Sequence, residues 1–301
     1  MSIELRKETK VIARIKGGLG NQLFCYAAAR RLALANNAEL VIDDVTGFAR
    51  DLQYRRKYML GHFNITARKA APAERLEPFE RCRRGAAMLL ARAKPFFQRS
   101  YLEEERAVFD PRLLELKVHG TLYLDGLWQS GKYFGDAEGT IREDLRISPP
   151  RDPVNAAMAE KIRGCNAVSL HVRWFGDAAK MDSEINLPPA YYSRAIKQIT
   201  GKVPDPHFFI FSDNPAAARQ IPGLPGDRVT VVNHNRGDEN ACSDLWLMTQ
   251  CKHFITANST FSWWGAWLSD TGAAKQVIVP DTIVKFNADI IPLSWESLSQ
   301  G

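Results

Sequence analysis

Short apolar runs alternate with longer amphipathic segments along most of the chain. Runs with strand composition lie at residues 11–15, 39–43, 121–125, 166–172, 207–212, 228–232, 253–257 and 276–280. Segments with helix composition lie at residues 23–37, 154–163, 188–200, 239–251 and 260–270. Continuous apolar strands joined by helices are typical of parallel sheets that are covered on both faces. The pattern therefore predicts an α/β protein.

The alternation is interrupted at residues 147–153, ISPPRDP, where three of seven residues are proline. Such a composition is typical of a linker between domains. A chain of 301 residues is long enough for two domains of ordinary size. We therefore predict a first domain over residues 1–148, a second over 149–285 and a C-terminal tail over 286–301. Residues 45–120 follow a less regular pattern.

The composition is that of a globular protein, with 45% hydrophobic and 25% charged residues. The net charge of +6 is compatible with a mixed surface or with an anionic partner. Residues 81–99 differ from the rest because they carry six basic residues and no acid. They also contain Met88, Leu89, Leu90, Phe96 and Phe97. Such a helix could lie on an anionic membrane, but the pattern favours a surface helix whose apolar stripe faces the core.

Several classes of protein are disfavoured. No apolar run approaches the 18 residues of a membrane-spanning helix, and the first 18 residues lack the apolar core of a signal peptide. Five widely spaced cysteines without a C-x-x-C pair argue against a disulfide framework and a zinc site. No basic-aromatic motif indicates nucleic-acid binding. We expect a cytoplasmic protein, with peripheral association with the inner membrane face through residues 81–99 as a further option.

In parallel sheets, ligands bind beyond the carboxyl ends of the strands, so the loops there hold the candidate residues. The first such loop is KGGLGNQ, residues 16–22. It lacks the third glycine of a dinucleotide fingerprint, since that position is Leu23, and this disfavours a nicotinamide oxidoreductase. Gly18, Gly20 and Asn21 would still allow a ligand to approach the backbone closely. The alternative is a tight turn with Asn21 as the helix N-cap.

A second loop, NSTF at residues 258–261, connects a strand to a helix. The side chains of Asn258, Ser259 and Thr260, together with the amides of the helix start, would form an anion-binding corner, with Phe261 beside it. Three tryptophans follow in the helix: Trp263, Trp264 and Trp267. Because tryptophan is costly to expose, we expect these three in the core.

The loop HVRWFGD, residues 171–177, follows a strand that reads as buried. Arg173 offers a planar guanidinium that suits a phosphate. His171 points to the same side of the strand and could bind a phosphate or a sugar hydroxyl. After the neighbouring strand come Ser212 and Asp213, of which Asp213 would hold a base or ribose, or cap the next helix.

These loops belong to a series of segments that occur in a fixed order. The segments are GGLGNQLFCYAAARRLA, GLWQSGKYF, HVRWFGD, LPPAYYSRAI, FFIFSDN and CKHFITANSTFSWWGAWL. Over residues 11–285 the chain resembles the bacterial α-1,2-fucosyltransferases of glycosyltransferase family 11. The resemblance implies a GT-B-like fold, with two Rossmann-like domains facing across a cleft. It also implies an inverting transfer of fucose from GDP-fucose to a galactoside hydroxyl, without a required metal ion or other cofactor. The first domain would be the acceptor side and the second the donor side.

In the wider fucosyltransferase group, a His-x-Arg-Arg motif holds the donor, and this chain matches it at His171 and Arg173. Trp174 replaces the second arginine, and Phe175 is inserted before the Gly-Asp pair that ends in Asp177. Since side chains alternate along a strand, we expect Trp174 to point to the opposite face from Arg173 and to pack behind the loop.

The resemblance also suggests catalytic roles. Arg173 would neutralise the diphosphate as the bond to the sugar breaks. Asp177 is the first candidate for the base, with Asp182 and Glu184 as alternatives, and Asn21 would position the acceptor or the phosphate. Two other functions stay open, which are a transferase for another GDP-sugar or linkage and a non-catalytic nucleotide- or sugar-binding protein.

Overall fold

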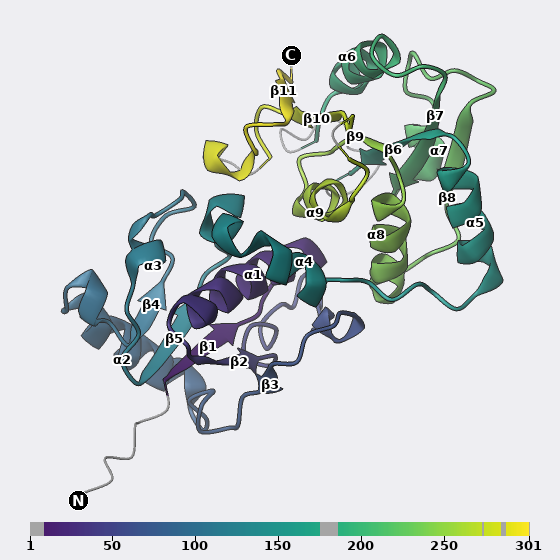
Figure 1. The fold of residues 1–301 in the computed structure, drawn as a ribbon. Helices are drawn as coiled ribbons and strands as arrows, with labels where there is room; N and C mark the ends of the chain where they lie inside the picture. Colours follow the sequence, from purple (N-terminus) through teal and green to yellow (C-terminus); the bar gives the residue numbers. More distant parts are fainter. Residues whose placement is uncertain (1–8, 175–185, 273, 284–286, 301) are drawn as a thin grey trace, which may run out of the picture. The chain divides into compact units, whose positions relative to one another are not determined.

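The computed structural model describes residues 9–174, 186–272, 274–283 and 287–300. The chain divides into two compact units, Met1–Leu145 and Arg146–Gly301, and the division falls next to the proline-rich segment at 147–153 (Figure 1). Each unit contains a parallel sheet with helices, so the predicted α/β class is confirmed.

The first unit has a sheet in which the described strands follow the order β3-β2-β1-β5-β4, all parallel. The strands are β1 (Lys10–Arg14), β2 (Glu39–Asp43), β3 (Arg68–Lys69), β4 (Tyr101–Glu103) and β5 (Thr121–Asp125). The helices are α1 (Leu19–Ala35), α2 (Glu80–Arg92), α3 (Arg112–Glu115) and α4 (Glu138–Asp144). Short 3₁₀ turns lie at Leu60–His62, Phe96–Gln98, Gly131–Tyr133 and Gly135–Ala137. The irregular region 45–120 thus contributes two strands and two helices.

The glycine-rich turn after β1 differs from its prediction in one respect. Helix α1 begins at Leu19, with Gly18 as an N-cap in extended conformation. Asn21 therefore lies inside the first helical turn, and its predicted role as N-cap is wrong. The left-handed conformation of the turn is at Gly17, whose φ of 78° would strain any other residue.

The second unit has a sheet whose described strands follow the order β11-β10-β9-β6-β7-β8, again parallel. The strands are β6 (Asn166–Val172), β7 (Pro206–Ser212), β8 (Val229–Val232), β9 (His253–Ile255), β10 (Val277–Pro280) and β11 (Glu296–Leu298). The helices are α5 (Pro153–Arg163), α6 (Pro189–Thr200), α7 (Pro215–Ala218), α8 (Ala241–Thr249) and α9 (Thr260–Leu268). Short 3₁₀ turns lie at Asp238–Asn240 and Ala288–Ile290.

The side chains of strand β6 alternate between the two faces of the sheet, and the alternation continues into the first residues after the strand. Val168, Leu170 and Val172 belong to one hydrophobic cluster with residues of α6. Trp174 continues this alternation, is 7% exposed and belongs to the same cluster. Its predicted packing behind the loop is thereby confirmed, while His171 and Arg173 occupy the alternate positions.

The segment 286–301 is not a tail in its described part. Strand β11 pairs with β10 at the edge of the sheet. The indole N–H of Trp263 donates to the carbonyl of Ile290 at 2.7 Å, and the ring of Trp295 lies 5.4 Å from that of Trp263. Residues 296–298 form a strand too short and polar to be recognised from the sequence, and it is identified by its pairing with β10.

Helix α2 contains most of the basic segment 81–99, and it does not place its leucines in the core. Ala91 is buried, and Ala87 and Met88 pack beside it against the sheet. Leu89 and Leu90 are 66% and 69% exposed. The favoured interpretation, a surface helix whose apolar stripe faces the core, is therefore confirmed for Met88 and Ala91 and wrong for Leu89 and Leu90. Among the helices of the described residues, none has the length and apolar character needed to cross a membrane.

The burial of Trp174 leads to a prediction about restoring the second arginine of the motif. Replacing Trp174 by Arg places a charge in the hydrophobic cluster, so we expect the free energy of unfolding to fall by about 3–5 kcal/mol. The control Trp174→Phe should cost less, because it leaves the site apolar. Urea unfolding of the three proteins measures the difference, and equal stability of Trp174→Arg and wild type would contradict the buried position.

Candidate functional site

The carboxyl ends of β6 and β7 meet at one edge of the second sheet, where Arg173 and Asp213 form an ion pair. Arg173 Nη1 lies 3.0 Å from Asp213 Oδ2. The other carboxylate oxygen, Oδ1, accepts the backbone N–H of Trp174 at 3.0 Å. Asp213 therefore holds the loop and the guanidinium together, and each of the two side chains is about one-third exposed.

Asp213 does not cap the next helix. That role belongs to Asn214, whose side chain accepts the backbone N–H of Ala217. The hydroxyl of Ser212 accepts the backbone N–H of Asn214 at 3.0 Å. The predicted capping alternative for Asp213 is therefore wrong, while binding of a base or ribose by Ser212 and Asp213 stays a prediction.

His171 is almost fully buried beside this pair. Its ring lies 5.6 Å from the ring of Phe261, at the start of α9. Nδ1 has no hydrogen-bond partner among the described residues. Burial, and secondarily the positive charge of Arg173, lower the pKa of His171 to about 3. The imidazole is thus neutral near pH 7, so at this edge it can exchange hydrogen bonds but adds no charge.

The loop before α9 lies next to the same edge because β9 pairs with β6. Ser259 is the N-cap of α9, and its hydroxyl accepts the backbone N–H of Phe261 at 3.3 Å. Its backbone carbonyl accepts the hydroxyl of Ser262. The predicted corner formed by Asn258, Ser259 and Thr260 is thus a capped helix start beside His171, and its binding of an anion stays a prediction.

The tryptophans of α9 are structural, as predicted. Trp263 and Trp264 are completely buried and Trp267 nearly so. The three rings lie 5.0–6.1 Å apart, with Trp263 and Trp267 stacked and Trp264 perpendicular to both. This cluster anchors the helix whose first turn lies at the candidate site.

The remaining predicted residues divide between the first unit and segments that the structure does not describe. Gly18, Gly20 and Asn21 lie at the start of α1, where the Asn21 side-chain oxygen accepts Gln129 Nε2 at 2.9 Å. The three candidate bases, Asp177, Asp182 and Glu184, lie outside the described residues, as does Phe175. Within the described residues, no group of three His, Cys, Asp or Glu side chains could hold a metal ion.

Sequence reasoning missed an ionic cluster at the carboxyl edge of the first sheet. Asp125 Oδ1 lies 2.9 Å from Lys16 Nζ and 3.1 Å from Arg14 Nη1, and Oδ2 accepts the Tyr101 hydroxyl at 2.7 Å. Burial by itself would raise the pKa of Asp125, but Lys16 and Arg14 hold it at about 2. An aspartate ending an otherwise apolar strand, as in TLYLD, was the available signal.

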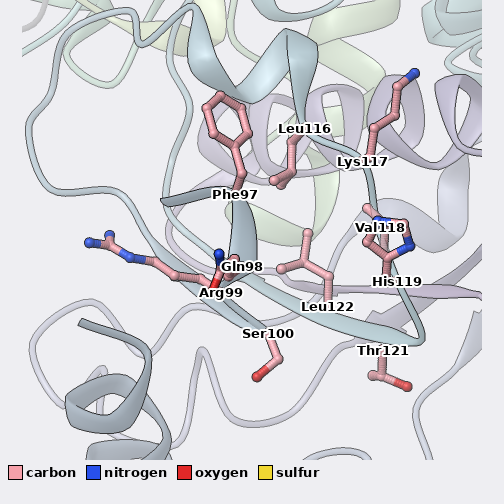
Figure 2. Close-up of a pocket in the computed structure, with 10 residues that line it drawn as sticks. All are labelled: Phe97, Gln98, Arg99, Ser100, Leu116, Lys117, Val118, His119, Thr121 and Leu122. Atoms are coloured by element: carbon pink, nitrogen blue, oxygen red, sulfur yellow. The ribbon is translucent and has the colours of Figure 1, made fainter. Parts of the chain in front are cut away.

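A small pocket lies at the opposite, amino end of β4 and β5, with a volume of about 70 Å³ (Figure 2). Figure 2 shows the charged ends of Arg99 and Lys117 extending away from the apolar residues Phe97, Leu116 and Leu122. Since ligands of parallel sheets bind at the carboxyl ends, this pocket is not part of the candidate site.

A fold with two Rossmann-like units also occurs in solved fucosyltransferase structures. The chain is similar to the NodZ α-1,6-fucosyltransferase soaked with GDP-fucose, with a TM-score of 0.51, 18% identity, and coverage of 87% of this chain and 93% of that one. It is similar to POFUT1 in complex with GDP-fucose, with a TM-score of 0.50, 13% identity, and coverage of 89% and 97%. The fold is therefore that of a GT-B-like glycosyltransferase, as expected.

The profile of Glycosyl transferase family 11 matches residues 10–295, and the chain belongs to this family. It is 28% identical to an alpha-1,2-colitosyltransferase of Escherichia coli, over 86% of this chain and 88% of that protein. It is 29% identical to the O-antigen biosynthesis glycosyltransferase WbnK of Escherichia coli, over 88% and 92%. The protein is thus a glycosyltransferase of family 11.

A half-buried carboxyl group, that of Asp244, lies near the carboxyl end of β8. Asp244 on α8 accepts Asn235 Nδ2 at 3.0 Å, and the same amide donates to Asn155 on α5. Burial raises the pKa of Asp244 to about 7. A raised carboxyl pKa stabilises the fold below about pH 4, and this contribution is lost as the pH rises to about 7.

We therefore predict that Asp244→Asn removes this loss. The variant should gain stability relative to wild type by about 2–3 kcal/mol between pH 5 and pH 8, because it carries no charge to bury. Urea unfolding of both proteins at each pH gives the difference, in which other titrating groups cancel. A difference that does not change with pH would contradict the raised pKa.

Proposed function

We propose that this glycosyltransferase transfers L-fucose from GDP-fucose to the 2-hydroxyl of a terminal galactoside, with inversion, during surface polysaccharide synthesis. The observation that carries the proposal is the Arg173–Asp213 pair beside the neutral His171, at the carboxyl edge of the second sheet. Likeness to fucosyltransferases that bind GDP-fucose, and to the O-antigen glycosyltransferase WbnK, supports the donor class and the pathway class.

Arg173 would serve catalysis because charge develops on the leaving group. As the bond between the sugar and the diphosphate breaks, negative charge grows on the diphosphate oxygens, and an oriented guanidinium stabilises that state more than the ground state. Asp213 fixes one side of the guanidinium, so little reorientation is needed during the reaction. We propose that this cation makes a metal ion unnecessary.

The neutral His171 would complement Arg173 by binding a neutral group. Its Nδ1 is buried without a described partner, which is costly unless a ligand provides one. A sugar or ribose hydroxyl can donate to or accept from an imidazole at this position. The base that activates the acceptor hydroxyl would come from the 177–184 segment, with Asp177 as the first candidate.

A second donor is favoured by one observation. A similar protein, of nearly the same length, is named as an alpha-1,2-colitosyltransferase. Colitose is fucose without the 3-hydroxyl, so a site for one sugar could admit the other unless a polar group of the protein hydrogen-bonds to that hydroxyl. GDP-colitose is therefore the alternative donor for the same α-1,2 transfer.

The proposal predicts a fucosylated product from GDP-fucose and lactose. We would incubate the protein with lactose and either GDP-fucose or GDP-colitose, and follow GDP release and product mass. A fucosyl-lactose product with α-1,2 linkage is expected. If kcat/KM is higher for GDP-colitose than for GDP-fucose by tenfold or more, the proposed donor is wrong and GDP-colitose takes its place. Saturable GDP binding without turnover of either donor would favour a non-catalytic protein.

Replacing Arg173 by Lys should lower kcat by about 10²–10³-fold, because lysine keeps the charge but loses the fork that Asp213 orients. Steady-state kinetics with the donor that proves active would measure the change. The control is Arg219→Lys, a change of the same kind at an exposed residue just after α7. An Arg173→Lys variant with kcat within threefold of wild type would remove Arg173 from the catalytic residues.

We also propose that the outward face of α2 binds an anionic membrane, where a lipid-linked acceptor would be present. Leu89 is directed away from the sheet, opposite the buried Ala91, and it shares this outward side with Ala86 and Cys82 at helical spacing. Arg81 and Arg92 lie on one flank of this apolar stripe, and Arg83 and Leu90 on the other. Exposed leucines flanked by arginines are typical of helices that lie in a membrane interface.

The membrane proposal predicts that replacing both Leu89 and Leu90 by Asp reduces binding to vesicles with anionic phosphatidylglycerol by tenfold or more. Both side chains are largely exposed, so the fold should tolerate the change. Leu52→Asp, at another exposed leucine of the same unit, is the matched control and should bind like wild type. Binding should also weaken in high salt. Equal sedimentation of all three proteins, or no binding by wild type, would exclude this surface.

A further inference from the structure

A second and larger pocket lies in the first unit, at the carboxyl ends of β4 and β5. Its volume is about 350 Å³, which lies within the range of about 300–1,000 Å³ for small-molecule sites. One wall comes from the loop after β4, from Glu103 to Arg112, and the opposite wall contains Trp128 and Tyr133. We call it the β4–β5 pocket. It lies at the sheet edge where ligands of parallel sheets bind.

Trp128 in this pocket has a strained backbone. Its φ of 52° is in the left-handed region, which costs a residue other than glycine of order 1–3 kcal/mol. The Glu104 carboxylate holds the conformation by accepting the backbone N–H of Leu127 at 2.7 Å and that of Trp128 at 3.0 Å. Such strain persists only where the surroundings fix it, and it concentrates at ligand sites.

The neighbouring residues fit Trp128 closely. A β-carbon on Gly126 would lie 2.6 Å from the indole ring and 2.6 Å from the Glu104 side chain, so only glycine is compatible with this arrangement. The indole Nε1 is buried and has no hydrogen-bond partner among the described residues. Burial also raises the pKa of Glu104, which is further evidence that the carboxyl is enclosed. The backbone at the floor of the pocket is thus held in one conformation by Glu104 and by the close contact between Gly126 and the indole.

The walls of the pocket are aromatic. The Phe109 ring lies 4.9 Å from that of Tyr133, and the Trp128 ring meets Tyr133 edge-on at 5.6 Å. The Tyr133 hydroxyl accepts the backbone N–H of Asp110 at 2.8 Å, which ties the β4 loop to this aromatic group. Phe109 is half-buried and lines the pocket, with Lys132 Nζ 5.4 Å from the centre of its ring.

The pocket is lined by charges of both signs, with two guanidiniums, Arg106 and Arg112, and four carboxylates, Glu103, Glu104, Glu105 and Asp110. Asp110 and Arg112 pair with each other, with Arg112 Nη2 2.6 Å from Asp110 Oδ2. Glu103 and Glu105 pair with Arg92 and Arg99, which lie outside the lining, so these acids are compensated and do not by themselves select a cation. The lining does offer donors and acceptors to a neutral ligand with many hydroxyl groups.

We propose that the β4–β5 pocket binds a neutral hexose unit of the acceptor glycan. A pyranose has an apolar C–H face that can lie on Phe109, and its hydroxyls can reach the acidic and basic side chains of the lining. The Glu104–Trp128 floor acts as positioning structure for that wall. The inference rests on the proposed transfer to a galactoside, because it identifies where a sugar of that acceptor is held.

The proposal predicts that Phe109→Ala raises the KM for lactose tenfold or more and leaves the KM for the GDP-sugar within twofold. Phe97→Ala, at a half-exposed phenylalanine of the same unit that lies outside the pocket, is the matched control and should leave both values unchanged. Glu104→Gln should raise the KM for lactose as well, because a neutral amide holds the Leu127–Trp128 backbone less firmly.

Binding of methyl β-D-galactopyranoside and lactose, followed by saturation-transfer difference NMR on the intact protein, tests the pocket without turnover. The proposal is supported if the wild-type signal is saturable, and if it is lost in Phe109→Ala and retained in Phe97→Ala. It is overturned if wild type binds neither sugar, or if Phe109→Ala binds and turns over lactose like wild type. Fucosyl transfer with an unchanged lactose KM in Phe109→Ala would leave the function standing and remove the pocket. If Phe109→Ala loses galactoside binding and the wild-type protein does not use GDP-fucose, the pocket stands and the proposed function fails.

Discussion

Parallel strands place their last side chains at one edge of a sheet, and in this protein carboxylates at these edges use both oxygens to hold residues of neighbouring strands and of the loops after them. Asp213 joins the Arg173 guanidinium to the backbone of Trp174. Glu104 joins two successive amides and fixes a strained tryptophan. Asp125 accepts from a tyrosine and pairs with two cations. Asp213 and Glu104 thus accept on both carboxylate oxygens and fix loop backbone, whereas Asp125 joins neighbouring strands.

The two units differ in how their buried polar side chains are paired. In the first unit, Asp125 is paired within the protein and stays ionised because Lys16 and Arg14 compensate its burial. In the second unit, His171 is buried beside Arg173, is neutral and lacks a described partner for Nδ1. An internally satisfied cluster stabilises a fold, whereas an unsatisfied group beside a partly exposed cation is suited to a ligand.

Alternation along β6 explains how this chain differs from the His-x-Arg-Arg motif without losing its core. The position after Arg173 points into the hydrophobic cluster, where a tryptophan packs well. The change therefore affects what lies behind the loop, and Arg173 keeps its pairing with Asp213. Helix α2 shows the opposite situation, because it packs Ala87, Met88 and Ala91 against the sheet and exposes Leu89 and Leu90.

The sequence by itself determined the α/β class, most strands of both sheets and the buried state of the α9 tryptophans, because these depend on local apolar periodicity. The order of motifs also gave the family, which the profile confirmed. Only the tertiary structure decided that Asn21 lies within α1 and that residues 296–298 pair with β10. It alone joined Glu104 to Trp128 across 24 positions, because a contact between loops depends on strand order, which local pattern does not encode.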